Sequence, residues 1–361
     1  MTESLVDLAE SLAAVEAIRD AAAQVLREQW APERLRAMLD DDGPGWAPDL
    51  WEMVTALGWP DLLVAETAGG GGGITAQLAG LAEEVGRATA SIPLVPAAVA
   101  AWCAGPSAVL RTVAFTEPDH ADHGSPQVVA RPADGGVVLS GVTPFVPYGS
   151  VADSFVTSAA REGSGALLVC VVDATTDGVS VTPLRALDAS PLADVAFGDV
   201  RVDAGAVIAE GADAQRILDG ARARLSIAWS AELVGVAAAV HEAATEYAKH
   251  RVAFGRPIGA FQAVKHRLVD LRGDIEVARA LVSRAAQAVE SGSADAEAMV
   301  ALAAFWAARR LRAVPEGAIQ VFGGIGYTWE HDAHLYLRRA AVLTALLPSP
   351  DSTCEIAMGR R

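Results

Sequence analysis

The periodicity of apolar residues changes twice along this chain, and these changes constrain its fold more than any other feature. From about residue 5 to residue 39, apolar residues recur at the three- and four-residue spacing of an amphipathic helix. From about Arg111, short β-rich runs alternate with Gly, Pro and Asp clusters, a pattern typical of an antiparallel sandwich or barrel. Helical spacing returns beyond Asp213, with a break at Ser291–Ser293 as expected between antiparallel helices. The sequence predicts an α+β fold.

We expect three domains: an N-terminal helical domain over 1–108, a central β domain over 109–210 and a C-terminal helical bundle over 211–361. A chain of 361 residues is long enough for two or three domains, each with its own core. Helices are expected to start near Pro48 and Thr75, and the glycine run Gly69–Gly73 predicts a loop. The expected β runs are 112–115, 127–130, 137–139, 154–158, 167–172 and 179–181.

Charge and cysteine content exclude several classes of function. The formal net charge of −17 disfavours nucleic acid as a partner, because most of the surface would repel phosphates. The three cysteines (Cys103, Cys170, Cys354) are widely spaced, which fits neither a disulfide scaffold nor a thiolate zinc site. No signal-peptide pattern precedes residue 30, and the apolar runs look too short or too often interrupted by charge to span a bilayer. We expect a soluble cytoplasmic protein without membrane partners.

The strongest local motif runs from Tyr247 to Gln262. A long helix is expected to end near Phe254, because Gly255 and Pro257 cannot continue it, and a new helix to begin after Gly259. Arg251 would then lie near a helix end, where its guanidinium can donate to an anion such as a diphosphate. An Arg beside a Gly-Pro turn can equally be a solvated or capping residue.

Two further motifs could contact a nucleotide. In Gln320–Tyr327, glycines would allow a ligand to lie against exposed backbone N–H groups, although the spacing is not that of the dinucleotide fingerprint. At the start of the β region, Thr116 precedes Glu117-Pro118 and could present its hydroxyl to a heterocycle. Either motif alone could also be an ordinary turn.

Two histidine pairs invite a metal hypothesis that we do not favour. His120 and His123 lie in a Pro-bounded loop without a third ligand cluster. His331 and His334 bracket an expected helix start, where Asp and Glu would serve as caps. Motifs typical of hydrolases and NTPases do not occur in the sequence. We therefore expect no metal site.

In their order along the chain, these segments resemble the acyl-CoA dehydrogenase family over nearly the whole length. The resemblance rests on Arg-x-x-Phe-Gly-Arg-Pro-Ile-x-x-Phe-Gln and Gln-x-x-Gly-Gly-x-Gly-Tyr in the C-terminal region. Leu57-Gly-Trp-Pro, Glu83-Glu-Val-Gly-Arg87 and Phe115-Thr-Glu-Pro118 support it upstream. It implies an N-terminal helical domain, a central β-barrel-like domain, a C-terminal four-helix bundle and assembly into a tetramer.

The resemblance also implies FAD at a subunit interface and α,β-desaturation of an acyl-CoA thioester. A carboxylate takes the α-proton, the β-hydrogen leaves as hydride to the flavin, and an electron-transfer acceptor reoxidises it. By position in the motifs, the residues expected to bind FAD are Arg251, Phe254, Phe261, Gln262, Gln320, Gly323, Gly324 and Thr116.

The sequence departs from the family where the catalytic base should stand. In the two branches of the family the base aligns with Val252 or with Leu347, and neither residue can accept a proton. Asp351 and Glu355 remain as outside candidates. The family's Trp-Ile-Thr over the flavin becomes Phe145-Val-Pro147, in which Pro147 supplies neither a hydroxyl nor an N–H.

A heterotetrameric (α2β2) dehydrogenase, as in actinobacterial steroid side-chain degradation, would account for this asymmetry. This chain would supply half of an interfacial FAD site, and a second dehydrogenase-like subunit would supply the base. Two alternatives remain open. The chain could be a self-sufficient homotetrameric dehydrogenase with a non-standard base such as Asp351, or a flavin-free scaffold subunit.

Overall fold

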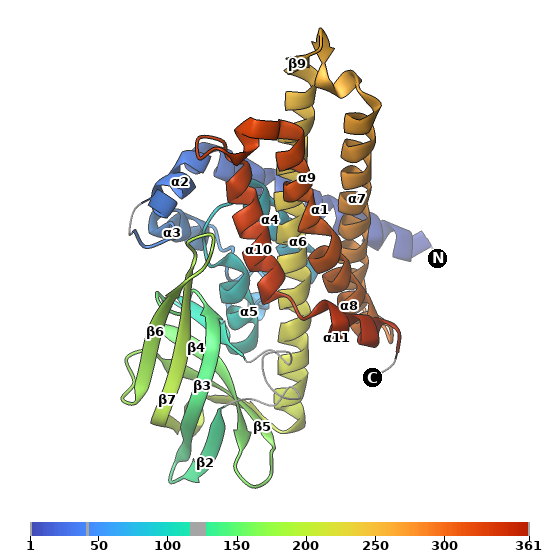
Figure 1. Ribbon diagram of the computed structural model, residues 1–361. Coiled ribbons are helices and arrows are strands. Elements are labelled where there is room, and N and C mark those ends of the chain that lie inside the picture. Colours follow the sequence, from blue (N-terminus) through green and yellow to red (C-terminus); the bar gives the residue numbers. More distant parts are fainter. Residues whose placement is uncertain (1, 41–42, 116–127, 360–361) are drawn as a thin grey trace. The chain divides into compact units, whose positions relative to one another are not determined.

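The computed structural model describes residues 2–40, 43–115 and 128–359, and the chain divides into two compact units. The helical unit comprises Met1–Asp42, Thr75–Ser91 and Ser226–Arg361, and the sheet unit comprises Gly43–Ile74 and Ile92–Leu225. The α+β class and the order helical, β, helical are confirmed (Figure 1). The three-domain boundaries stay a prediction. Thr116, His120 and His123 lie outside the described residues.

Long helices build the helical unit, and α6 contributes its residues from Ser226 onward. A π-turn at Ala307–Leu311 and a 3-10 turn, η6 (Gly323–Tyr327), interrupt the C-terminal helices. The helices are α1 (Thr2–Gln29), α2 (Pro32–Asp40), α4 (Thr75–Ala88), α6 (Ala212–His250), α7 (Gln262–Glu290), α8 (Ala296–Trp306), α9 (Ala313–Phe322), α10 (Ala333–Leu346) and α11 (Pro350–Ala357).

Helices α4 and α6 approach each other closely at two glycines. A Cβ atom on Gly86 of α4 would lie 2.0 Å from the carbonyl oxygen of Glu232 on α6. A Cβ on Gly235 of α6 would lie 1.9 Å from the carbonyl oxygen of Glu83 on α4. Only glycine fits at either position, because any side chain would overlap the facing backbone.

A buried carboxylate joins three helices of the same unit. Glu83 of α4 accepts hydrogen bonds from Arg19 of α1 at 3.0 Å and from Arg279 of α7 at 2.9 Å. Its neighbour Glu84 also accepts from Arg19 at 3.0 Å. Burial raises the pKa of Glu84, although Arg19 and Arg87 oppose that shift. A buried carboxylate is costly unless a cation pairs with it. The ion pairs with Arg19 and Arg279 therefore orient α1 and α7 on α4.

The sheet unit contains one eight-stranded sheet in the order β6-β7-β3-β2-β4-β5-β8, with β1 paired to β4. Most pairs are antiparallel as predicted, but β1–β4 and β2–β4 are parallel, which corrects the purely antiparallel expectation. Strands β7 and β8 lie outside the predicted runs. The strands are β1 (Arg111–Ala114), β2 (Val129–Ala133), β3 (Gly136–Pro147), β4 (Ser154–Arg161), β5 (Leu167–Asp173), β6 (Val179–Arg185), β7 (Pro191–Asp203) and β8 (Val207–Glu210).

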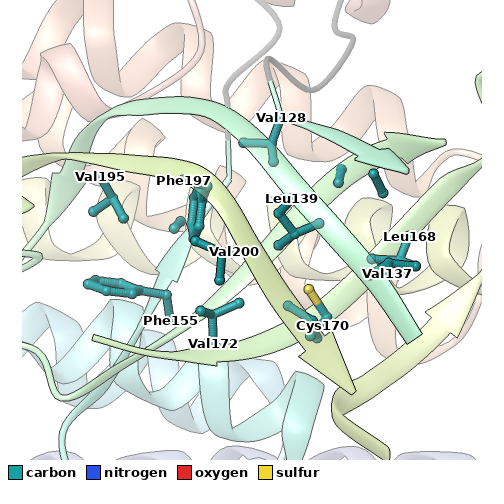
Figure 2. Packing of buried hydrophobic residues seen from close by; sticks show 14 of the residues in the cluster. Val128, Val137, Leu139, Phe155, Leu168, Cys170, Val172, Val195, Phe197 and Val200 are labelled. Carbon is teal, nitrogen blue, oxygen red and sulfur yellow. The ribbon is translucent and has the colours of Figure 1, made fainter. Parts of the chain in front are cut away.

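The strands share one hydrophobic core, in which Phe155, Leu139 and Leu168 are fully buried (Figure 2). Two helices, α3 (Pro48–Ala56) and α5 (Leu94–Ala104), belong to the same unit, and α5 packs on β1 and β4. The prediction of a helix start at Pro48 is confirmed: Pro48 opens α3, where a missing N–H costs nothing. The glycine run Gly69–Gly73 forms the predicted loop.

Helix α6 is the one helix among the described residues that is long and apolar enough to cross a membrane. This corrects the expectation that no apolar stretch has that length. Within its most apolar window, 83% of the residues are buried inside the protein. Burial of this kind is what a core helix shows.

Candidate functional site

The segment after α6 forms a short hairpin rather than further helix. Helix α6 ends at His250, four residues before the predicted end at Phe254. Strands β9 (Val252–Ala253) and β10 (Arg256–Pro257) then pair antiparallel. Phe254 and Gly255 connect them with φ values of +52° and +76°, as a two-residue hairpin turn requires. The 3-10 turn η4 (Ile258–Ala260) follows, and α7 begins at Gln262, as predicted for a helix after Gly259.

The hairpin extends past the ends of α6 and α7 (Figure 1). Its residues are exposed, except Ala253, which is half-buried. The Phe254 side chain is 95% exposed and meets Phe261 edge-to-face, with ring centroids 6.2 Å apart. The Arg256 guanidinium lies 4.2 Å from the centroid of the Phe261 ring. The Arg251 side chain is also exposed, while its carbonyl accepts the N–H of Ile258 at 2.8 Å. The hairpin therefore presents aromatic and cationic groups to a partner or ligand.

Positive charge is concentrated around this hairpin. Both lysines of the chain, Lys249 and Lys265, flank it, and no acidic residue occurs between Tyr247 and Val269. In a chain of net charge −17, such a segment attracts anions. The sequence motifs did not lead us to predict Arg256, Lys249 or Lys265 as binding residues. Lysine occurs at no other position in the sequence, and this clustering could have indicated a cationic segment.

The glycine-rich motif lies at the end of α9, and its backbone is open. Gly323 has φ +67°, and a Cβ atom on Gly323 or Gly324 would meet no atom within 4 Å. Gln320, on the last turn of α9, is exposed. The Gly323 N–H donates to the Ile319 carbonyl, and the missing side chains leave room for a flat ligand to lie against this backbone.

An aromatic contact brings the two motifs together. The rings of Tyr247 on α6 and Phe322 on α9 meet edge-to-face, with centroids 5.3 Å apart. Because Tyr247 lies one helical turn before Arg251 and Phe322 directly precedes Gly323, the hairpin and the glycine turn share one end of the helical unit. The structure thus assembles seven of the eight predicted binding residues at this end; the eighth, Thr116, is outside the described residues.

Neither of the two positions at which the resemblance predicts a catalytic base carries an acid. Val252 lies on β9 and is 57% exposed. Leu347 follows the last turn of α10 and is 3% exposed, packed in the interior. The outside candidates Asp351 and Glu355 are exposed on α11, whose first turn is capped by Ser349.

The end of β3 has little backbone left to offer a ligand. A register shift against β7 lies between Thr143 and Val146, and Phe145 adopts φ +54° there. The Phe145 N–H donates to Asp194 Oδ1 at 3.1 Å. The Pro147 carbonyl accepts the hydroxyl of Thr112 at 2.7 Å. The Phe145 N–H is thus occupied, and Pro147 has no N–H. Neither residue therefore offers a ligand a free N–H or a hydroxyl.

The second histidine pair serves the start of α10. Asp332 occupies the N-cap position of α10, as predicted for an acid, but its side chain makes no capping hydrogen bond and pairs with Arg36. The Ala333 N–H donates to Nδ1 of His331 at 3.1 Å. The His334 ring stacks on Trp329, with centroids 4.5 Å apart. Among residues 2–40, 43–115 and 128–359, no three His, Cys, Asp or Glu side chains gather into a metal site.

The chain thus has a helical region, a sheet with its own core, and a second helical region in which an exposed cationic hairpin connects α6 to α7. Residues 13–111 match the family model "Acyl-CoA dehydrogenase, N-terminal domain", and residues 213–347 match "Acyl-CoA dehydrogenase, C-terminal domain". The chain belongs to the acyl-CoA dehydrogenase family.

Relatives and solved structures agree with that assignment. The chain is 32% identical to acyl-CoA dehydrogenase IpdE2 of Mycolicibacterium smegmatis, over 93% of this chain and 94% of that protein. It is similar to a chain of the ChsE4-ChsE5 complex from Mycobacterium tuberculosis, with a TM-score of 0.85, 27% identity and 96% of each chain covered. A chain of the Tcur3481-Tcur3483 steroid ACAD G363A variant matches with a TM-score of 0.83, 27% identity and coverage of 96% and 97%.

Proposed function

We propose that this chain is the base-deficient subunit of an FAD-dependent acyl-CoA dehydrogenase. In this proposal a second dehydrogenase-like subunit supplies the catalytic base, and the FAD site lies at the interface. One observation carries the proposal: Leu347, which the family resemblance aligns with the base, is a buried aliphatic side chain. A hydrocarbon side chain cannot accept a proton, and Val252 at the other position is equally inert.

The residues of the hairpin and the glycine turn fit the nucleotide half of FAD. When bound, FAD supplies the hydride acceptor for desaturation. From this chain, Arg251 would donate to the diphosphate oxygens, and Gln320 would bond the adenine edge. Gly323 and Gly324, where a Cβ meets no neighbour, would let that ring lie against the backbone. Phe254, Phe261 and Gln262 would complete the contact with FAD. Because Phe254 is 95% exposed, it would contact an FAD molecule that is held by a neighbouring subunit.

Similar proteins support a two-subunit assembly and suggest a substrate class. Two of the solved structures are described as a ChsE4-ChsE5 complex and as a Tcur3481-Tcur3483 steroid ACAD, each named for two proteins. We extend this to a heterotetramer that acts on a steroid side-chain thioester of CoA and passes electrons to a separate acceptor. We expect the protein to be located in the cytoplasm.

The test compares the chain produced alone with the chain co-produced with a dehydrogenase-like partner that has an intact base. Alone, it should hold little FAD and reduce no dye with acyl-CoA. The complex should absorb as a flavoprotein and turn over. Replacing the partner's base should abolish turnover while FAD stays bound. Full FAD occupancy and turnover by the lone chain would overturn the proposal.

A pair of variants locates this chain's own contribution within the complex. Arg251→Gln should lower FAD occupancy, because a guanidinium–phosphate contact is lost. Arg284→Gln is the matched control, since Arg284 is exposed and pairs with Asp295 at 3.0 Å, away from both motifs in the sequence. Asp351→Asn should leave turnover unchanged; its loss would favour a self-sufficient enzyme. A complex that remains colourless would favour the flavin-free scaffold.

A further inference from the structure

The sheet unit contains a cavity of about 640 Å³ that the proposed flavin chemistry does not use. It is bounded by α3, by the end of α5 and by the segment that leads into β1. Its volume falls within the range of small-molecule sites and greatly exceeds one side chain. All of its lining residues belong to the sheet unit.

Aromatic and aliphatic groups form most of the cavity wall. Trp46 and Trp51 both line it and are half-buried. Pro60, Ala97 and Val151 add further apolar surface. The face of an indole ring attracts a cation more strongly than that of any other aromatic side chain.

The charged groups of the cavity are predominantly acidic. Glu52, Asp61 and Asp153 line it together with a single basic residue, Arg111, which leaves two more negative than positive side chains. Asp153 is already engaged, since its Oδ2 accepts the N–H of Leu110 at 2.9 Å. Arg111 is held by Ser154 Oγ and by the carbonyl of Gly105, each at 3.3 Å.

Among the acidic residues that line the cavity, Asp61 is the half-buried one, whereas Glu52 and Asp153 are exposed. No hydrogen bond reaches its carboxylate from any residue that the structure describes, although it is half-buried. Burial raises the pKa of this carboxyl, and the attraction of Arg111 offsets that effect only in part. A second cation beside Asp61 would stabilise the ionised carboxylate in this partly desolvated position.

We propose that this cavity binds a small organic cation, an ammonium group on an apolar body, with Asp61 as its counter-ion and Trp46 and Trp51 as its aromatic walls. The acidic excess disfavours an anionic ligand despite Arg111. The apolar lining disfavours an inorganic cation, which needs several oxygen ligands. The site is separate in sequence from the hairpin and the glycine turn that we assign to FAD.

Calorimetric titration of the complete protein tests this with two probes of similar size and opposite charge. Phenylethylammonium should bind at one site, and at least about tenfold more tightly than 3-phenylpropionate, because a charged hydrogen bond is worth that much. Asp61→Asn should weaken ammonium binding about tenfold. Trp51→Phe, which keeps an aromatic ring, should weaken it less. Asp177→Asn, an exposed acid in the turn before β6, is the control and should change nothing.

Several outcomes would overturn the proposal. Equal affinity for the carboxylate and ammonium probes would show that the cavity recognises apolar bulk alone. If Asp61→Asn binds the ammonium probe as tightly as the parent protein does, and circular dichroism confirms that the variant is folded, then Asp61 is not the counter-ion. Absence of ammonium binding up to about 10 mM, an affinity below about 3 kcal/mol, would reject the site altogether.

Discussion

Arg339 on α10 donates two hydrogen bonds to the same carboxylate oxygen of Glu232 on α6, one of them from Nε at 2.8 Å. The two side chains are 7% and 3% exposed, so the pair is buried inside the helical unit. A buried pair of this kind depends on both members, since either charge alone would be left in a low-dielectric interior.

We therefore expect Arg339→Met to lower the free energy of unfolding by about 3–5 kcal/mol, because it strands the Glu232 charge. The double variant Glu232→Leu/Arg339→Met should recover much of that loss, since no charge remains buried. Urea unfolding followed by circular dichroism measures both effects. A double variant no more stable than Arg339→Met would contradict this account.

The glycine contacts between α4 and α6 give a second prediction. Gly86→Ala should destabilise the protein by at least about 1–3 kcal/mol, because its Cβ would overlap the Glu232 carbonyl oxygen. Gly273→Ala is the matched control on α7, where an added Cβ meets no atom within 4 Å. The control should stabilise the helix by about 0.5–1 kcal/mol, and thermal unfolding of the two variants should shift in opposite directions.

The contact between Tyr247 and Phe322 predicts a coupling between the two parts of the proposed FAD site. Tyr247→Leu removes an edge-to-face contact worth about 0.5–1.5 kcal/mol. We expect the complex carrying it to retain several-fold less FAD after dialysis while its secondary structure is unchanged. Trp306→Phe serves as the control, because Trp306 bonds the Asp274 carbonyl on α7 and is distant in sequence from both motifs. Equal FAD loss from both variants would contradict a specific role.

The histidines at the start of α10 predict a loss of stability in mild acid. Burial lowers the pKa of His331 and of His334 below the ordinary value of 6.5, while Asp332 opposes and Arg36 reinforces both shifts. Trp329 and Arg338 also act on His334, the first raising and the second lowering its pKa. Both rings are therefore neutral in the folded protein at pH values where the unfolded chain already binds protons.

Whether stability rises or falls with pH follows from which state, folded or unfolded, binds protons first. Well above about pH 6.5 both states carry neutral rings, and these histidines do not affect the free energy of unfolding. As the pH falls below that value, the unfolded state binds protons first, so stability declines until the folded pKa values are also passed. The variant His331→Gln/His334→Gln should show a flatter decline between pH 7 and pH 5 in urea unfolding. A decline as steep as in the parent protein would assign it to other groups, such as buried carboxylates.

How far the sequence predicted the site depends on the range of the interactions involved. The end of α6 was predicted four residues too late, at Phe254, since Val252 and Ala253 pair with β10 and a strand of two residues has no detectable periodicity. Strand β7, which pairs with both β3 and β6, was also missed, although its buried and less buried residues alternate along most of its length and this alternation was a usable signal. Parallel pairing of β1 with β4 joins segments about forty residues apart, which no local pattern encodes.

By itself the sequence determined which side chains are available: an arginine and glycines that we propose bind a nucleotide, and Val252 and Leu347 at the two positions where the family resemblance predicts a base. Residue identity settles such questions, because a hydrocarbon side chain has no proton-accepting atom in any fold. The tertiary structure decided that Leu347 is buried, that Tyr247 and Phe322 bring two distant motifs to one end of the helical unit, and that Asp61 faces a tryptophan-lined cavity. Those facts depend on which surfaces are buried against each other, and burial is a property of long-range packing rather than of neighbours in the chain.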